Sequence, residues 1–336
     1  MDPGRRYPSS TDVARLAGVS QSAVSRAFSG GKRVSKEASR KIFAAAEALG
    51  YSPNFIPRIL LKHRSHLVAV VISGTNNPFY AVALEEFTKA LQKAGNQVLL
   101  VHVDSGDSLD GVMPKLASYR VDAFVSALPM LSSEAAAAFA QIRIPAISFN
   151  TPISNLWVAS VCVDSAGGAC AVADLFLARG ARSFAFVGGS EGSHASSERL
   201  RGYRTRLFDR GFPHVETTAG NFSYKGGFDA AIELRRRGAL PDAIFCANDL
   251  MAIGVIDALR RKVGARVPQD VLVAGFDDVP EASWGGYDLT TVVQDVPAMV
   301  TEAMSILQTM ISSVSSAGGI HRVVAGRLIE RSSTLR

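Results

Sequence analysis

Cysteine, tryptophan and long apolar runs are scarce in this sequence. Its 336 residues include three Cys and two Trp. Cys162, Cys170 and Cys246 have neither the spacing of metal ligands nor the pattern of a disulfide framework. Because their neighbours are apolar residues in strand-like or helical segments, we expect these side chains to be buried free thiols.

Segments that would direct the chain to a membrane are also lacking. No apolar run is long enough to span a bilayer. The first six residues, MDPGRR, are followed by polar and helical sequence rather than by the apolar stretch of a signal peptide. We therefore expect a cytoplasmic protein. The 47% hydrophobic content is ample for a large core, and the length predicts two or three domains.

Charge is unevenly distributed along the chain. Residues 1–66 contain twelve Lys or Arg and four Asp or Glu, a balance of +8, whereas the whole chain carries +6. The remaining 270 residues therefore carry −2. A basic head on a slightly acidic body indicates a head that binds polyanions and a body with a different role.

Residues 11–26 have the pattern of a helix-turn-helix. Val13, Leu16 and Ala17 are spaced as on one face of a helix. Gly18 ends that helix, and Ser20 can cap a second one. Two short helices joined by a glycine-containing turn are typical of a DNA-binding head.

The second helix of this pair carries the residues that we expect to read DNA. It buries Ala23 and Val24 and exposes polar side chains, namely Gln21, Ser22, Ser25 and Arg26. Gln and Ser can hydrogen-bond to base edges or phosphates, and Arg can contact guanine with two hydrogen bonds. The alternative is an ordinary helical hairpin.

Three helices are expected in the head, residues 1–50. Ser9 can cap the first helix, with Asp12 returning the hydrogen bond in a variant of the capping box. Ser35 can cap the third helix, over 36–49, and Gly50 ends it. The buried face of the third helix is expected to contain Ile42, Phe43, Ala46 and Leu49.

Residues 51–66 form the expected hinge helix or linker. The segment is too apolar for a solvated linker and too short and basic for a membrane span. One or two helical turns after Pro57 would place Leu60 beside Arg58 and Lys62. Such a segment could dock in a minor groove, with an apolar wedge at a base step and basic side chains on phosphates. A hinge that packs on the body fits the pattern equally well.

Short apolar strands alternate with helices from residue 67 onward. The expected strands are 67–73, 97–103, 122–127, 145–149, 183–188, 243–247 and 271–275. The expected helices are 80–94, 109–118, 133–141, 165–178, 197–210, 226–237 and 250–262. This alternation predicts an α/β body, residues 67–336, of two doubly wound parallel-sheet lobes. Ligands of such lobes bind at the carboxyl ends of the strands.

Several motifs recur in a specific order and spacing. They are DVA, AGVS and VSR within 12–26, VS at 34–35, LGYSPN at 49–54, NPFY at 77–80, IFCANDLMAIG at 244–254, GFDD at 275–278 and LTTVVQ at 289–294. In these motifs the chain resembles the LacI/GalR family of bacterial transcription repressors, from about Ser10 to Arg331. The resemblance implies a periplasmic-binding-protein-like body, with one lobe at about 67–163 and 292–322 and the other at about 164–291 and 323–336.

For DNA, the resemblance implies a homodimer on a roughly palindromic operator and a hinge helix that becomes ordered on DNA. The implied DNA-binding residues are Ser20, Gln21, Ser22, Ser25, Arg26, Asn54, Arg58 and Leu60. Gln21 and Ser22 lie at the family's main base-reading positions, and Leu60 matches the leucine that enters the central minor-groove step. Pro57 departs from the small helix former usual in the family, and Leu61 makes the hinge more apolar. The tail shows no leucine heptads, so we expect a dimer rather than a coiled-coil tetramer.

For the body, the resemblance implies an effector site between the lobes. The implied residues are Asn77, Phe79, Tyr80, Asn150, Arg199, Phe222, Asn248 and Asp277. Arg199 corresponds to the family's ligand-gripping arginine, and an Asp paired with an Arg suits vicinal hydroxyls. A sugar or sugar derivative is therefore the expected effector.

Structural roles are the alternative for each of these positions. The aromatic residues could belong to the core, Asn248 and Asp277 could be helix caps, and Arg199 could be an ordinary surface residue. Val296 stands where relatives often have an aromatic residue, so Trp284 or Tyr287 could supply that face of the site.

Other classes of function fit the sequence less well. His194 lies near Ser193 and Ser196–Ser197, but no serine sits in a Gly-x-Ser-x-Gly elbow. The turn at 188–192 suggests a phosphate site but lacks the dinucleotide-binding spacing. A solute-binding protein would not need the basic head, and non-specific DNA binding would leave the body unexplained. We expect no enzyme activity, no cofactor and no metal site.

Overall fold

The computed structural model describes residues 7–28, 34–52, 64–73, 77–103, 116, 118–127, 143–153, 157–312 and 319–336. The chain divides into two compact units, Met1–Ser65 and His66–Arg336. Several predictions lie outside the described residues. They concern the helix at 133–141, most of the helix at 109–118, and the hinge residues Asn54, Pro57, Arg58, Leu60 and Leu61.

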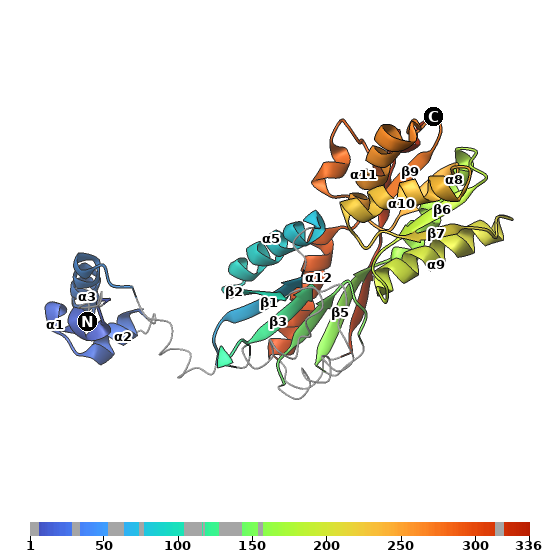
Figure 1. Ribbon diagram of the computed structural model, residues 1–336. Helices are drawn as coiled ribbons and strands as arrows, with labels where there is room; N and C mark the ends of the chain where they lie inside the picture. The colour runs from blue at the N-terminus through green and yellow to red at the C-terminus, as the bar shows by residue number, and fades with distance from the viewer. Residues whose placement is uncertain are drawn as a thin grey trace. The chain divides into compact units, whose positions relative to one another are not determined.

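Three short helices form the first unit: α1 (Ser10–Ala17), α2 (Gln21–Phe28) and α3 (Lys36–Leu49) (Figure 1). They pack around Val13, Val24 and Ile42, whose side chains have no exposed surface. One fully buried residue from each helix therefore defines this small core.

In the first unit, capping residues lie at the beginnings and ends of helices where the sequence predicted them. The Ser9 hydroxyl accepts a hydrogen bond from the Asp12 amide at 3.3 Å, and the Asp12 carboxylate accepts one from the Ser9 amide at 3.0 Å. The Ser35 hydroxyl accepts from the Ala38 amide at 3.2 Å. Gly18 and Gly50 take φ values of +64° and +62°, a left-handed conformation that glycine adopts without steric cost. These predictions are confirmed.

The predicted burial is wrong for two apolar residues of the head, which are exposed. Leu16 is 57% exposed and Phe43 is 47% exposed. On α1 the buried residues are Val13, Ala14 and Ala17, and Leu16 lies about 60° from Val13 on the side away from them. Phe43 stays at the rim, where its ring meets the ring of Phe28 edge to face at 5.0 Å.

The first lobe of the body is built on a six-stranded parallel sheet with the order β11-β5-β4-β3-β1-β2. Its strands are β1 (Leu67–Ser73), β2 (Gln97–Val103), β3 (Ala123–Ala127), β4 (Ala146–Phe149), β5 (Val158–Val163) and β11 (His321–Val324). Helices α5 (Pro78–Lys93) and α12 (Val296–Ser312) contact each other beside this sheet (Figure 1).

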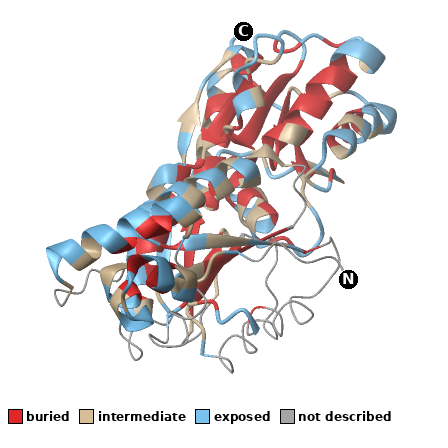
Figure 2. Cartoon of the chain, turned by 90° about the vertical axis from the view of Figure 1, so that its left-hand side faces the viewer, coloured by how far each residue is buried: buried red, intermediate tan, exposed pale blue. Residues whose placement is uncertain are grey.

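Alternation along β1 shows that both faces of the first sheet are covered. Val68, Val70 and Ile72 belong to the cluster that includes α5, whereas Ala69 and Val71 belong to a second cluster. Side chains of successive strand residues point to opposite faces, so burial of both sets requires cover on each side. Figure 2 shows this burial concentrated in the strands and on the inner faces of the helices.

The second lobe has a six-stranded sheet with the order β12-β10-β9-β8-β6-β7, in which only β12 is antiparallel to its neighbour. Its strands are β6 (Phe184–Gly188), β7 (Glu216–Ala219), β8 (Ala243–Cys246), β9 (Leu272–Asp277), β10 (Thr290–Val293) and β12 (Arg327–Ile329). Its helices are α8 (Ser165–Ala178), α9 (His194–Asp209), α10 (Tyr224–Arg237), α11 (Asp249–Ala258), a π turn (Leu259–Val263) and two 3-10 turns (Pro280–Ser283 and Ser332–Thr334). Helices α8 and α9 form one packed pair, and α10 and α11 form another.

The predicted architecture of a helix-turn-helix head and two α/β lobes is confirmed. Sheet membership places the second and third crossings between the lobes after Val293 and Val324, two residues beyond the expected 291 and 322. Strands β5, β7, β10, β11 and β12 and helix α12 were not among the expected elements. The polar strand β7 shows why, because it has no apolar run and its burial alternates between half-buried and exposed.

The three cysteines are free, as predicted, but they are not all buried. Cys162 and Cys246 are buried, whereas Cys170 is half-buried. Cys170 lies on α8 where it faces α9, and its thiol donates a hydrogen bond to the Gly202 carbonyl at 3.3 Å. Within the described ranges, no helix combines the length and apolar character needed to cross a bilayer.

Candidate effector site and DNA-contact surface

Helix α2 presents a polar surface to solvent. Gln21, Ser22, Ser25 and Arg26 are exposed, as is Ser20 just before the helix. Buried Val24 anchors the opposite side of α2 to the core of the head. The predicted exposure of these side chains is confirmed.

Local hydrogen bonds order this surface without burying it. The Arg26 guanidinium donates to the Ser22 hydroxyl at 3.5 Å, and the hydroxyls of Ser20 and Ser22 lie 3.0 Å apart. The Gln21 amide donates to the Ser10 hydroxyl of α1 at 2.9 Å. Such weak, exposed hydrogen bonds can be exchanged for bonds to DNA at little cost.

A buried Arg–Asp pair lies at the carboxyl edge of the second sheet. Asp277 is the last residue of β9, and its carboxylate lies 3.7 Å from the Arg199 guanidinium. Both side chains are only 3% exposed. The Arg199 guanidinium also donates to the Ala247 carbonyl and stacks on the Phe276 ring at 3.6 Å from its centre. Its Nε has no hydrogen-bond partner in the described part of the chain.

Three amide side chains connect this pair to the first lobe. The Asn77 amide, before α5, donates to Asp277 at 3.3 Å. The Gln294 amide donates to the other Asp277 oxygen at 2.6 Å, and its own carbonyl accepts from the Asn150 amide at 2.6 Å. Asn77 and Asn150 belong to the first lobe, whereas Arg199 and Asp277 belong to the second. We call these five side chains the interlobe network.

Backbone geometry supports the interlobe network. Asn150 follows β4 with a φ of +65°, and Asp277 ends β9 with a φ of +123°. Asn tolerates the left-handed region, but Asp277 adopts a conformation that L residues rarely take. Strain of this kind concentrates at functional sites, where the surrounding contacts maintain it.

Burial shapes the ionisation of this edge of the sheet. It raises the pKa of Asp277, and the neighbouring Arg199, Gln294 and Asn77 act in the opposite direction. Burial lowers the pKa of Arg199, which Asp277 opposes. Burial and, next, the charge of Asp277 raise the pKa of Asp249 well above its usual value. Two buried carboxyl groups, Asp277 and Asp249, therefore interact electrostatically with the buried guanidinium of Arg199.

Tyr80 lies close to this charged pair, whereas Phe79 belongs to the core. Burial and then the charge of Asp277 raise the pKa of the half-buried Tyr80, while Arg199 lowers it. The Phe79 side chain is 3% exposed, and its ring stacks on Phe149 with a centre distance of 6.3 Å. Of the two predicted aromatic residues, Tyr80 lies near the interlobe network, whereas Phe79 is a core residue, which was the structural alternative.

Asn248 is a helix cap, which was the structural alternative for this residue. Its amide oxygen accepts from the Met251 amide at 3.0 Å and caps α11, and its amide nitrogen donates to the Phe222 carbonyl at 3.4 Å. The residue is 1% exposed. The half-buried Phe222 covers Gly189, where a Cβ atom would collide with the Phe222 ring. A contact of Asn248 or Phe222 with an effector stays a prediction.

Sequence reasoning missed Gln294 and Asp249 as site residues. Gln294 follows β10 where the chain passes between the lobes, and a polar residue directly after a buried strand was the available signal. Asp249 accepts from the Thr291 hydroxyl at 2.6 Å and from the Val279 amide at 2.9 Å, which ties β10 to the turn after β9.

Trp284 and Tyr287 do not join the interlobe network. Trp284 is 56% exposed, and the Tyr287 hydroxyl donates to Asp257 at 3.3 Å. Among the described residues, the hydrogen bonds of Trp284 and Tyr287 go to Glu281, Asp257, Asp288 and each other, outside the network.

The serines around His194 have structural roles. The Ser193 hydroxyl accepts from the Ser196 amide at 3.4 Å and caps α9, so this helix begins three residues before the predicted 197. The Ser196 hydroxyl accepts from the Gly189 amide at 2.9 Å. The glycine-rich turn is thereby held against α9 by its own chain.

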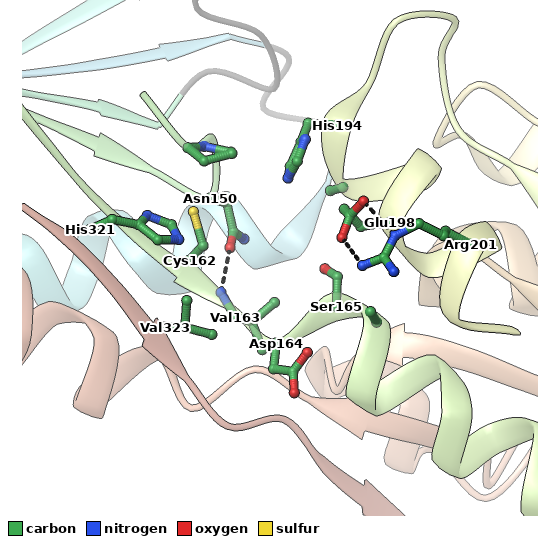
Figure 3. Close-up of a pocket in the computed structure, with 13 residues that line it drawn as sticks. Asn150, Cys162, Val163, Asp164, Ser165, His194, Glu198, Arg201, His321 and Val323 are labelled. Atoms are coloured by element: carbon green, nitrogen blue, oxygen red, sulfur yellow. Dashed lines mark hydrogen bonds and ion pairs between the residues drawn. The ribbon is translucent and has the colours of Figure 1, made fainter. Parts of the chain in front are cut away.

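A cavity of about 150 Å³ opens beside Asn150, between the lobes (Figure 3). Asn150, β5 and β11 line it on the side of the first lobe. The beginnings of α8 and α9 line it on the side of the second lobe. Since Asn150 belongs to both, the cavity adjoins the interlobe network.

Two family descriptions match the chain. Residues 11–54 match the bacterial regulatory proteins of the lacI family, and residues 173–334 match a periplasmic binding protein-like domain. The HTH-type transcriptional regulator CelR of Thermobifida fusca is 33% identical over 319 residues, which cover 90% of this chain and 92% of CelR.

Solved structures extend this similarity to the fold. A complex of the transcriptional regulator CelR with cellobiose has a TM-score of 0.74 at 29% identity and covers 97% of this chain and 99% of its own. The Lac repressor dimer bound to operator and the anti-inducer ONPF has a TM-score of 0.88 at 24% identity. That match covers 98% of this chain and 100% of the repressor chain.

Proposed function

The chain belongs to the lacI family of bacterial regulatory proteins, and on that premise we propose that it is a transcriptional regulator controlled by a sugar-like effector. It binds a roughly palindromic operator as a homodimer, in the cytoplasm, and is not an enzyme. The interlobe network carries this proposal. A polyhydroxylated ligand that bonds to Arg199 and Asp277 replaces bonds that now join the lobes, so it changes the free-energy difference between body conformations.

The proposed domains are the head (1–50), the hinge (51–66) and the effector-binding and dimerisation body (67–336). In the head, Gln21 and Ser22 contact base edges, and Ser20, Ser25 and Arg26 contact phosphates or guanine. The exposed polar surface of α2 supports this assignment. In the hinge, Asn54, Arg58 and Leu60 complete the DNA contact, with Leu60 in the minor groove.

The proposed effector site contains Asn77, Tyr80, Asn150, Arg199, Phe222, Asn248 and Asp277, and we add Gln294 because it bonds to Asn150 and Asp277. Phe79 supports the ring of Tyr80 from the core, with 5.3 Å between the ring centres. Arg199 supplies hydrogen-bond donors and Asp277 supplies acceptors, which together suit vicinal hydroxyls. The relative CelR was solved as a complex with cellobiose, which supports a sugar as the effector class here.

Selection from a random pool of DNA duplexes tests the DNA-binding half of the proposal. The full chain is expected to enrich a sequence with two inverted half-sites whose centres lie about one DNA turn apart. Affinity for it falls steeply between low and physiological salt because phosphate contacts release counterions. Enrichment of no sequence, or an affinity insensitive to salt, contradicts sequence-specific operator binding.

Thermal shift of the full chain tests the effector half. A sugar that raises the melting temperature is expected to lose its effect in Asp277→Asn, which weakens the pairing with Arg199. The matched control is Asp174→Asn, because Asp174 forms exposed pairs with Arg206 at 3.4 Å and Arg210 at 3.3 Å. An equal loss of the ligand effect in both variants contradicts the proposed site.

A further inference from the structure

The cavity beside Asn150 has walls from both lobes and is separate from the Arg199–Asp277 pair. Helix α9 explains this separation, since Glu198 lines the cavity whereas the next residue, Arg199, joins the interlobe network. Consecutive helical residues point about 100° apart, so α9 serves both places at once. Asn150 lies between them and lines the cavity while its amide donates to Gln294.

The size of the cavity suits one further sugar ring. Its volume of about 150 Å³ is roughly ten times the space that a single buried water needs. One sugar ring with its substituents has about a dozen non-hydrogen atoms, each similar in size to a water oxygen, so one ring matches this volume. Because the walls come from both lobes, an occupant would make different contacts in open and closed bodies and would bias that equilibrium.

An oriented carboxylate faces this space. Arg201 donates to both Glu198 oxygens, from Nε at 2.9 Å and from Nη2 at 2.6 Å. These hydrogen bonds lower the pKa of Glu198, so the group is ionised at neutral pH. Two fixed oxygens retain lone pairs for sugar hydroxyls. Figure 3 shows Glu198 and His194 on the α9 side of the cavity and Asn150 and His321 on the opposite side.

Polar and apolar side chains both line the cavity. The apolar ones include Cys162 and Val163 of β5, Val323 of β11 and Ala195 of α9. A pyranose ring has hydroxyls at its edge and C–H groups on its faces, so a lining of both kinds suits it.

Charge argues against an acidic occupant. Glu198 and Asp164 both line the cavity, and the lining cation Arg201 is already paired with Glu198. A phosphate or carboxylate group would meet two carboxylates there, while the guanidinium of Arg201 is already paired with Glu198. The cavity therefore favours a neutral ligand.

We propose that this cavity is a second sugar subsite and that the effector consists of at least two linked rings. The first ring binds Arg199 and Asp277, and the second, neutral ring lies between Glu198, His194 and His321. This inference rests on the proposed function, because it assumes that a sugar binds at the interlobe network.

Calorimetric titration of the full chain tests the second subsite. The probes are glucose and galactose as single rings, cellobiose, lactose and maltose as double rings, and glucose 6-phosphate. At least one double-ring sugar is expected to bind about tenfold more tightly than its component single ring. Glucose 6-phosphate is expected to show no such gain over glucose.

Variants separate the two subsites. Glu198→Gln, which removes the charge, and Ala195→Leu, which fills the cavity, are each expected to abolish the advantage of the double ring, with single-ring affinity unchanged in both. The matched control is Glu233→Gln on α10, because Glu233 also pairs with an arginine three residues on, Arg236 at 2.7 Å, away from the cavity. It is expected to change no affinity.

Each other result overturns the inference. Equal binding of single and double rings, or a double-ring advantage that survives Glu198→Gln and Ala195→Leu, removes the second subsite and leaves the proposed function intact. Loss of single-ring binding in Glu198→Gln shows that Glu198 does not belong to a separate subsite. Absence of binding by every sugar in the panel rejects the proposed sugar effector together with this inference.

Discussion

The surface of α2 and the interlobe network use similar polar side chains in opposite ways. On α2 the residues are exposed, and Gln21 reaches a partner only 11 positions away. In the interlobe network the residues are mostly buried, and the bonds join positions 200 and 144 residues apart, Asn77 to Asp277 and Asn150 to Gln294. Exposed groups can exchange a lost partner for water, whereas buried groups cannot. The first arrangement is therefore available for an external partner, and the second stabilises the body until a ligand replaces its bonds.

Asp277→Ala is expected to break the interlobe network most severely. It leaves Arg199 buried without its carboxylate partner, which should reduce the free energy of unfolding by about 3–5 kcal/mol. Urea denaturation of the full chain measures the loss. Asp229→Ala is the control, because Asp229 pairs only with Lys225 among the ion pairs of the described residues, on the exposed face of α10, and its removal should change the free energy of unfolding by less than about 1 kcal/mol. Similar losses in the two variants would show that the interlobe pair is not specially buried.

Gln294→Ala is expected to have the next largest effect. It removes hydrogen bonds to the half-buried Asn150 and the buried Asp277 and leaves their polar atoms without those partners, at a cost of about 2–3 kcal/mol. The same denaturation experiment measures it. Gln308→Ala changes the same residue type at an exposed position of α12 and should be neutral. If Gln294→Ala is neutral as well, the amide does not link the lobes energetically.

Ser9→Ala tests a local polar contact in the head. It removes the cap of α1 and should destabilise that helix by about 1 kcal/mol. Faster amide hydrogen exchange in α1, with no change in the body, is the expected readout. Thr11→Ala, at an exposed position of the same helical turn, should leave exchange unchanged. Equal acceleration by both variants argues against a capping effect.

Arg26→Ala should have the smallest effect on stability and still weaken DNA binding. Its exposed side chain predicts a change in the free energy of unfolding within about 0.5 kcal/mol. Affinity for the selected operator should fall about tenfold or more, as measured by titration with labelled DNA. The control is Lys41→Ala on α3, whose ammonium pairs with Glu37 at 2.9 Å. Unchanged DNA affinity in Arg26→Ala would remove this residue from the proposed contact surface.

Residue patterns were sufficient for the features of the fold that depend on near neighbours. The capping residues Ser9 and Ser35 and the left-handed Gly18 and Gly50 follow from contacts within one helical turn. The alternation of strands and helices likewise predicted two parallel-sheet lobes. Patterns predicted burial less reliably on the short helices of the head. Leu16 has the spacing of a buried residue but is exposed, because spacing does not reveal which side of a helix packs against its neighbours.

The candidate site was only partly accessible from sequence. Family resemblance brought Arg199, Asp277, Asn77 and Asn150 together, and the structure connects them. It could not distinguish Asn248, whose side chain caps α11, from a residue that is open to a ligand. Gln294 was missed because its partners Asn150 and Asp277 lie 144 and 17 residues away, beyond the reach of local patterns.

Local interactions therefore specify the helices of the head, their caps and the α/β character of the body, since each depends on residues a few positions apart. Only the folded body decides which buried polar groups meet across the lobes. It also decides that Glu198 and Arg199, adjacent in the chain, face two different places. The physical reason is that a hydrogen bond requires its two atoms within about 3 Å. Between distant segments, that proximity is set by the packing of whole sheets and helices.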